Sequence, residues 1–192
     1  MGSEMCIRDR TITILLILLT VFGTTLELNA GGNPCPTLLN HNVKSFGSGQ
    51  SINLCEAYQG KVIVIVNTAN KCDLSEQYDA LEALQDKFGQ EGLAILGFHN
   101  NDYLGQMKGL PETSKEYCRL ASSVRFPLFT NQRGLPENPT PIFRSLANAA
   151  GEYPQWNFHK YVIDREGELR GSFDSLIDPM DPSLTHLVKT LL

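Results

Sequence analysis

The feature that most constrains the fold is an uninterrupted run of five β-branched residues, 62–66. Such a run without polar alternation predicts a strand buried on both faces, which requires cover on both sides of its sheet. Polar residues 67–71 predict a turn, and Ser75 is expected to open an amphipathic helix. Cys72 falls in this turn. Because backbone N–H groups and the helix dipole at a helix N-terminus stabilise a thiolate, Cys72 is a candidate reactive cysteine.

The rest of the chain alternates short strands and helices without a repeat or a linker. A βαβα half precedes a ββα half, which is the arrangement of the thioredoxin fold. We therefore expect an α/β domain with a central mixed sheet flanked by helices. The expected elements are strands at 43–46, 52–54, 62–66, 93–98 and 126–129, a helix opened by Ser75, helices at 111–122 and 140–150, a hairpin within 156–173 and a closing helix from 181.

The N-terminal thirty residues have the pattern of a secretory signal peptide. Arg8 and Arg10 precede the apolar run 12–22, which is too short to span a bilayer, and small residues follow near Ala30. The first ten residues are unusual for the start of a natural leader. We expect a signal peptide at 1–30, a single domain at 31–192, and export to the periplasm or outside the cell. A buried N-terminal helix and an uncleaved anchor are the alternatives; the mature form is expected to have no membrane span.

Five cysteines are present, of which Cys6 would leave with the leader. Export implies an oxidising compartment, and Cys35 and Cys55 flank a short, turn-rich segment that suits a structural disulfide. Two unpaired thiols are the alternative. No spacing resembles a zinc site, and no motif indicates a metal, haem or nucleotide cofactor. The net charge of −5, without a run of Lys or Arg, argues against nucleic acid as a partner.

The residue three positions after Cys72 is Ser75, so a local dithiol is absent. A lone thiolate is suited to attacking an electrophile such as a peroxide, which converts it to a sulfenic acid. Cys118 is the candidate thiol that resolves this acid. The alternative is that both are ordinary buried cysteines.

Three motifs in the same order resemble those of the glutathione peroxidase family. The first runs from Gly60-Lys-Val through Asn67-Thr-Ala to Cys72, where some members carry selenocysteine. The second is Leu96-Gly-Phe with Asn101. The third contains Trp156-Asn-Phe, Lys160-Tyr, Asp164-Arg and Gly167. The resemblance covers residue 51 to the C-terminus.

The resemblance implies a role for each matching residue. Cys72 would attack the hydroperoxide, and the indole N–H of Trp156 and the amide of Asn157 would donate hydrogen bonds beside its sulfur. Cys118 matches the segment that carries the resolving cysteine in non-selenium members. Asp102 stands where the family has its catalytic Gln. A carboxylate there, or at Asp73, would raise the pKa of the Cys72 thiol.

The implied function is a thiol-dependent peroxidase that reduces hydrogen peroxide and organic or lipid hydroperoxides under oxidative stress. Its reductant would be a thioredoxin-like protein or glutathione, with no bound cofactor, and the short connection 150–156 resembles monomeric members. An exported thioredoxin-fold binding protein, inactivated through Asp102 and Asp73, is the alternative from another class. A dithiol oxidoreductase lacks its CxxC here, and a peroxiredoxin lacks its Pro-x-x-x-Thr/Ser-x-x-Cys motif.

Overall fold

The central strands of the sheet are the ones that the sequence predicts to be buried. The computed structural model describes residues 34–69, 74–99, 123–130 and 133–192. Within them, β3 (Val62–Thr68) pairs in parallel with β4 (Leu93–His99) on one side and antiparallel with β6 (Lys160–Ile163) on the other. Every residue of β3 and of β4 is buried.

Four further strands complete a mixed sheet in the order β2-β1-β5-β4-β3-β6-β7. β5 (Leu128–Thr130) runs parallel to β4, whereas β1 (Asn42–Ser45) is antiparallel to both β5 and β2 (Ser51–Asn53). β7 (Leu169–Phe173) forms the predicted hairpin with β6. The expected mixed sheet is therefore confirmed.

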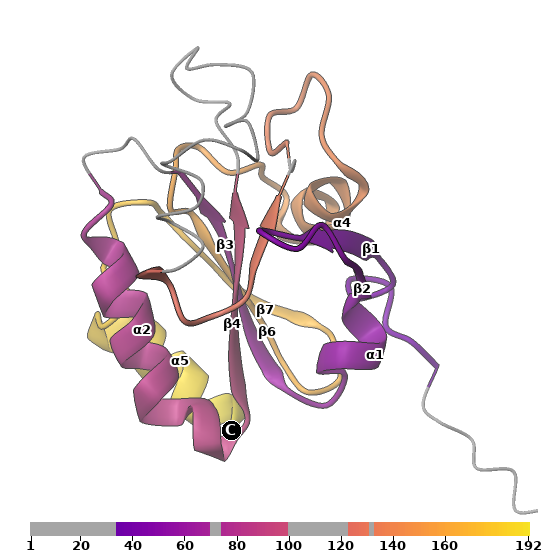
Figure 1. Ribbon diagram of the computed structural model, residues 1–192. Coiled ribbons are helices and arrows are strands. Elements are labelled where there is room, and N and C mark those ends of the chain that lie inside the picture. Colours follow the sequence, from indigo (N-terminus) through magenta and orange to yellow (C-terminus); the bar gives the residue numbers. More distant parts are fainter. Residues whose placement is uncertain (1–33, 70–73, 100–122, 131–132) are drawn as a thin grey trace, which may run out of the picture. The chain divides into compact units, whose positions relative to one another are not determined.

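Helices cover both faces of this sheet (Figure 1). α2 (Gln77–Phe88) and α5 (Pro182–Leu191) pack on one face, and their apolar side chains share a core cluster with the valines of β3. α1 (Leu54–Tyr58) and α4 (Pro141–Ala150) contribute to the cluster on the opposite face. Each fully buried Val, Leu or Ile side chain contributes about 1.5–3 kcal/mol, so this two-sided burial is the main source of stability.

The starts of the last two helices follow from local sequence. Pro141 and Pro182 occupy the first turn, where a missing N–H costs nothing. Asp181 also caps its helix, because its carboxylate accepts the Ser183 backbone N–H at 2.8 Å. Both predicted starts are confirmed.

The predicted turn after β3 is wrong in its first two residues. Asn67 and Thr68 continue the strand, because they pair with Phe98 and His99 of β4. The partner strand thus extends the ladder past the point where the apolar run ends. This places two polar side chains inside the sheet.

Two helix starts also differ from the expectation. Residues 74–76 form turns, so α2 begins at Gln77 and not at Ser75. Leu54, expected in a strand, begins α1, because the Asn53 side chain accepts the Glu56 backbone N–H at 3.1 Å. A five-residue helix is too short to leave a periodic signal in the sequence.

Several sequence-based predictions lie outside the described residues: the signal peptide at 1–30, the helix at 111–122, and the residues Cys72, Asp73, Asp102 and Cys118. In the part of the chain that the structure describes, no helix has the length and apolar character needed to cross a bilayer.

The predicted disulfide between Cys35 and Cys55 is present, with 5.9 Å between the two Cα atoms. It joins the segment before β1 to α1, at a sequence separation of 20 residues. Its cross-link ties the N-terminal edge of the described chain to the core, since Cys55 is buried beside Leu54.

We expect the Cys35→Ser/Cys55→Ser double variant to lose about 3 kcal/mol of unfolding free energy, because a loop of this length is no longer closed in the unfolded chain. Urea denaturation of the wild type and the variant measures the difference. Adding a reductant should lower the stability of the wild type and leave the double variant unchanged. Equal stability of the two oxidised proteins would contradict the prediction.

Candidate functional site

The C-terminal ends of β3 and β4 meet at one edge of the sheet. Thr68 and His99, the last residues of these strands, are register partners. Cys72 lies outside the described residues, but the residues that bracket it, Ala69 and Leu74, continue from β3 and lead into α2. The carboxyl ends of parallel strands are where α/β proteins commonly build their sites.

A segment distant in sequence is bound to this edge by Asn67. The Asn67 side chain donates from Nδ2 to the carbonyl of Trp156 at 3.1 Å. Its backbone carbonyl accepts the Phe158 N–H at 2.7 Å, and its own N–H donates to the carbonyl of His159 at 3.3 Å. Three hydrogen bonds to one residue therefore hold residues 156–159 against the end of β3.

The two predicted site residues in this segment differ in exposure. Asn157 is 2% exposed, whereas Trp156 is 39% exposed, although it is a large aromatic side chain. An apolar surface and a buried amide thus lie next to each other where β3 ends. This is the arrangement expected of a site that a ligand must reach.

Phe158 adopts a backbone conformation that bulky residues avoid. Its φ is 66°, in the left-handed region. The ring is fully buried and packs edge-on against Tyr78 of α2, with ring centroids 5.3 Å apart. Together with its N–H bond to Asn67, this packing fixes the strained residue. Such strain is concentrated at functional sites, where the surroundings hold it in place.

Buried polar atoms without a hydrogen-bond partner gather at the same edge. Buried polar groups are normally paired, so each exception needs a reason. In the described part of the chain, Nε2 of His41 is a buried side-chain atom without a hydrogen-bond partner that lies away from this edge. Those at the edge are Asn67 Oδ1, Thr68 Oγ1, Gln77 Oε1, both ring nitrogens of His99, Asn157 Oδ1, His159 Nδ1 and Ser175 Oγ.

A buried lysine ties the loop after β7 to this edge. Lys160 pairs with Val66 across the β3–β6 ladder and is fully buried. Its Nζ donates to the Ser175 carbonyl at 3.1 Å and to the Ile177 carbonyl. Gln77, the first residue of α2, donates to the same Ser175 carbonyl at 2.8 Å. One carbonyl therefore joins the start of α2, β6 and the loop.

Burial disfavours positive charge on the basic groups of this edge. It lowers the pKa of His99 to about 4. Burial also lowers the pKa of His159, against the opposing effect of Glu152 and Asp174. For Lys160, burial lowers the pKa to about 8, although nearby Asp178 and Asp174 oppose the shift. Both imidazoles are therefore neutral at pH 7.

The structure brings two of the predicted site residues, Trp156 and Asn157, to the end of β3. The other three, Cys72, Asp102 and Cys118, lie outside the described residues. Sequence reasoning missed the parts played by Asn67, His99 and Lys160. Each is a buried polar residue at or next to the end of an otherwise apolar strand, and a polar residue directly beside an apolar run was the available signal.

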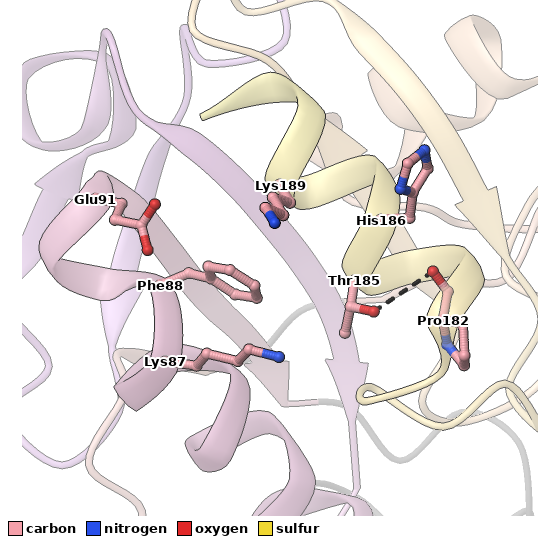
Figure 2. A pocket seen from close by; sticks show the side chains of 7 residues that line it. All are labelled: Lys87, Phe88, Glu91, Pro182, Thr185, His186 and Lys189. Atoms are coloured by element: carbon pink, nitrogen blue, oxygen red, sulfur yellow. Dashed lines mark hydrogen bonds between the residues drawn. The ribbon is translucent and has the colours of Figure 1, made fainter.

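A groove elsewhere on the molecule lies between α2 and α5 (Figure 2). It is at the C-terminal end of α2, about 18 Å along the helix from Gln77. Thr185 and Pro182 on its α5 side are joined by a hydrogen bond of 3.4 Å. None of the residues that line the groove belongs to β3 or β4. Its lining residues are Lys87, Phe88, Glu91, Pro182, Thr185, His186 and Lys189.

Among the residues that the structure describes, no group of three or more His, Cys, Asp or Glu side chains is placed to hold an ion. The chemistry of the described edge is that of hydrogen-bonding side chains around the end of a strand.

Solved structures of the same architecture identify the fold. A crystal structure of Trgpx in its apo form superposes with a TM-score of 0.65 at 24% identity, covering 81% of this chain and 94% of that one. A structure of dsbF in mixed oxidised and reduced forms superposes with a TM-score of 0.57 at 14% identity, covering 82% and 98%. At these identities the likeness shows the fold alone. The protein has a thioredoxin-like α/β fold, as predicted.

Sequence comparisons identify the family. A family model described as glutathione peroxidase matches residues 39–147. The glutathione peroxidase homolog BsaA of Bacillus subtilis is 34% identical over 139 residues, which cover 70% of this chain and 86% of the relative. The hydroperoxy fatty acid reductase Gpx2 of Synechocystis sp. is 34% identical over 137 residues, covering 71% and 88%.

These matches show that the chain belongs to the glutathione peroxidase family. The resemblance to this family is thereby confirmed. The protein is an oxidoreductase of the peroxidase class.

Proposed function

We propose that this protein is a thiol peroxidase that reduces hydrogen peroxide and organic or lipid hydroperoxides through Cys72. The observation that carries the proposal is the binding of residues 156–159 to the end of β3 by Asn67. β3 is the strand that precedes Cys72 in the sequence, and we propose that the Trp and Asn of the family motif lie beside this cysteine. Relatives named hydroperoxy fatty acid reductases support a lipid hydroperoxide as one substrate.

In the proposed first step, the Cys72 thiolate attacks the terminal oxygen of the hydroperoxide. The O–O bond breaks, and its electron pair leaves with the other oxygen, which takes up a proton to become water or an alcohol. Cys72 is left as a sulfenic acid. Trp156 and Asn157 are proposed to donate hydrogen bonds that favour the thiolate and the departing oxygen.

In the second step, the Cys118 thiol attacks the sulfenic acid, forming a Cys72–Cys118 disulfide and releasing water. Two thiols from a thioredoxin-like protein or from glutathione then reduce this disulfide. The reaction needs a thiol co-substrate and no bound cofactor. We further propose that Asp102 lies in this site in place of the family's Gln.

We propose that the protein acts outside the cytoplasm, as a monomer, in the response to oxidative stress. The Cys35–Cys55 disulfide supports an oxidising compartment, because such bonds persist in exported proteins. Residues 1–30 would be its signal peptide.

The proposal is tested on protein that retains its Cys35–Cys55 disulfide and has Cys72 and Cys118 reduced, by adding one equivalent of hydrogen peroxide and mapping disulfides by mass spectrometry. A Cys72–Cys118 disulfide is expected, beside Cys35–Cys55. Turnover is then measured with glutathione and with thioredoxin in parallel, on hydrogen peroxide and on a lipid hydroperoxide. Labelling of both Cys72 and Cys118 as free thiols after peroxide would contradict the mechanism.

A further inference from the structure

The last side chains of β3 and β4 form a polar pair above an apolar core. Thr68 and His99 are register partners in a parallel ladder. Side chains alternate along a strand, so Thr68 lies on the same face as Val66 and Val64, which belong to the cluster under α2 and α5. His99 lies on that face by the same alternation from Ile95. The two side chains are therefore neighbours on the α2 face.

Both residues of this pair are buried, and their polar side-chain atoms lack hydrogen-bond partners among the described residues. Thr68 is 0% exposed and His99 is 4% exposed. Neither Oγ1 of Thr68 nor either ring nitrogen of His99 has a hydrogen-bond partner in the described part of the protein. An unsatisfied buried polar group destabilises a fold, and three such atoms on adjacent residues call for an explanation other than stability.

The atoms beneath the pair offer no partner. The ring of Phe46 meets the ring of His99 edge-on, with centroids 5.3 Å apart. The methyl group of Thr68 faces the position of Gly97, where a Cβ would lie 3.4 Å from it and would collide with Leu128 and Phe126. Because these contacts among the described residues are apolar, a partner for the pair has to come from beyond the ends of the two strands.

The hydrogen-bonding capacity of the pair matches a hydroperoxide. Burial lowers the pKa of His99 to about 4, so its imidazole is neutral and has one donor and one acceptor nitrogen. The Thr68 hydroxyl adds a donor and an acceptor. A hydroperoxide has one O–H donor and two acceptor oxygens, and it carries no charge that would need a counter-ion in a buried site.

We propose that His99 and Thr68 form a binding pair for the hydroperoxide group of the substrate, oriented for attack by Cys72. This inference rests on the proposed function and adds two residues to its site. The pair holds the O–O–H group by hydrogen bonds, and no proton transfer is assigned to it. Orientation of the O–O–H group by fixed hydrogen bonds raises the rate of attack without changing the nucleophile.

The test uses substitutions that remove the polar atoms and keep the shape. His99→Phe places a ring against Phe46, and Thr68→Val keeps a β-branched side chain in β3. We expect both variants to unfold at the same temperature as the wild type or at a higher one, because buried unsatisfied atoms are gone. The rate constant for oxidation of the reduced protein by hydrogen peroxide should fall by about tenfold or more in each. His99→Gln, which keeps a donor and an acceptor, should recover much of the rate.

His41→Phe is the matched control. His41 also has an unpartnered Nε2, but it precedes β1, and β5 separates β1 from β4. Its variant should be oxidised at the wild-type rate. The inference is overturned if His99→Phe and Thr68→Val are both oxidised within about twofold of the wild type. The proposed function is tested separately: it fails if Cys72→Ser still consumes peroxide, whatever the variants of the pair do.

Discussion

Replacement of Cys72 by serine is expected to abolish hydroperoxide consumption, with a loss of at least about 10³-fold in turnover. A serine hydroxyl is not ionised near neutral pH and does not attack an O–O bond, so the first step of the proposed cycle has no substitute nucleophile. The measurement is peroxide consumption coupled to a thioredoxin system, with hydrogen peroxide and with a lipid hydroperoxide.

Cys118→Ser is the matched control for this prediction. It removes the proposed resolving thiol and leaves the nucleophile, so one equivalent of peroxide should still be consumed rapidly and form a sulfenic acid at Cys72. Multiple turnovers with thioredoxin should then slow strongly. Undiminished turnover of Cys72→Ser would rule out Cys72 as the peroxidatic residue, and the redox-inert binding protein would then be the better explanation of the site.

The second large effect is expected in the pH dependence of stability at Lys160. Burial lowers the pKa of Lys160 to about 8 in the folded protein, whereas an unfolded lysine has its ordinary value of 10.5. Between these values the unfolded chain binds more protons at this position, so stability rises with pH across this interval. Relative to Lys160→Met, the wild type should gain up to about 3 kcal/mol of unfolding free energy from pH 8 to 10.5.

Urea denaturation at several pH values across this interval gives the unfolding free energy of each protein. The contributions of the other titrating groups largely cancel when the two free energies are subtracted. Lys189→Met, an exposed lysine on α5, is the control and should show no such change relative to the wild type. If the difference in unfolding free energy between the wild type and Lys160→Met is constant from pH 8 to 10.5, the buried lysine keeps its ordinary pKa and the prediction is wrong.

Lys160 also helps to connect separate elements of the fold. Lys160 and Gln77 donate to one carbonyl, Ser175, and so join the start of α2 to the loop after β7. In the described part of the chain, the Lys160 ammonium donates to carbonyl oxygens and forms no ion pair with a carboxylate. Burial of a charge without an ionic partner is costly to the stability of the fold.

Local patterns in the sequence were sufficient for much of the fold. The unbroken β-branched run predicts a central strand, since such residues avoid water on both faces, and β3 is buried throughout. Pro141 and Pro182 mark the starts of α4 and α5 because proline is tolerated in the first turn of a helix. The motif that contains Trp156 and Asn157 identified two residues of the segment that lies at the end of β3.

Only the tertiary structure decided how the edge at the end of β3 is held. Asn67 bonds to the Trp156 carbonyl across 89 residues, and Gln77 bonds to Ser175 across 98. No local pattern encodes such pairs, because each partner is determined by the packing of distant elements. For the same reason Asn67 and Thr68 belong to β3 and not to a turn: the neighbouring strand β4 supplies their ladder partners. The sequence alone determined the family and most of the strands and helices. The folded chain decided which polar residues meet at the end of β3, because hydrogen bonds between distant segments form only after the apolar core has set their positions.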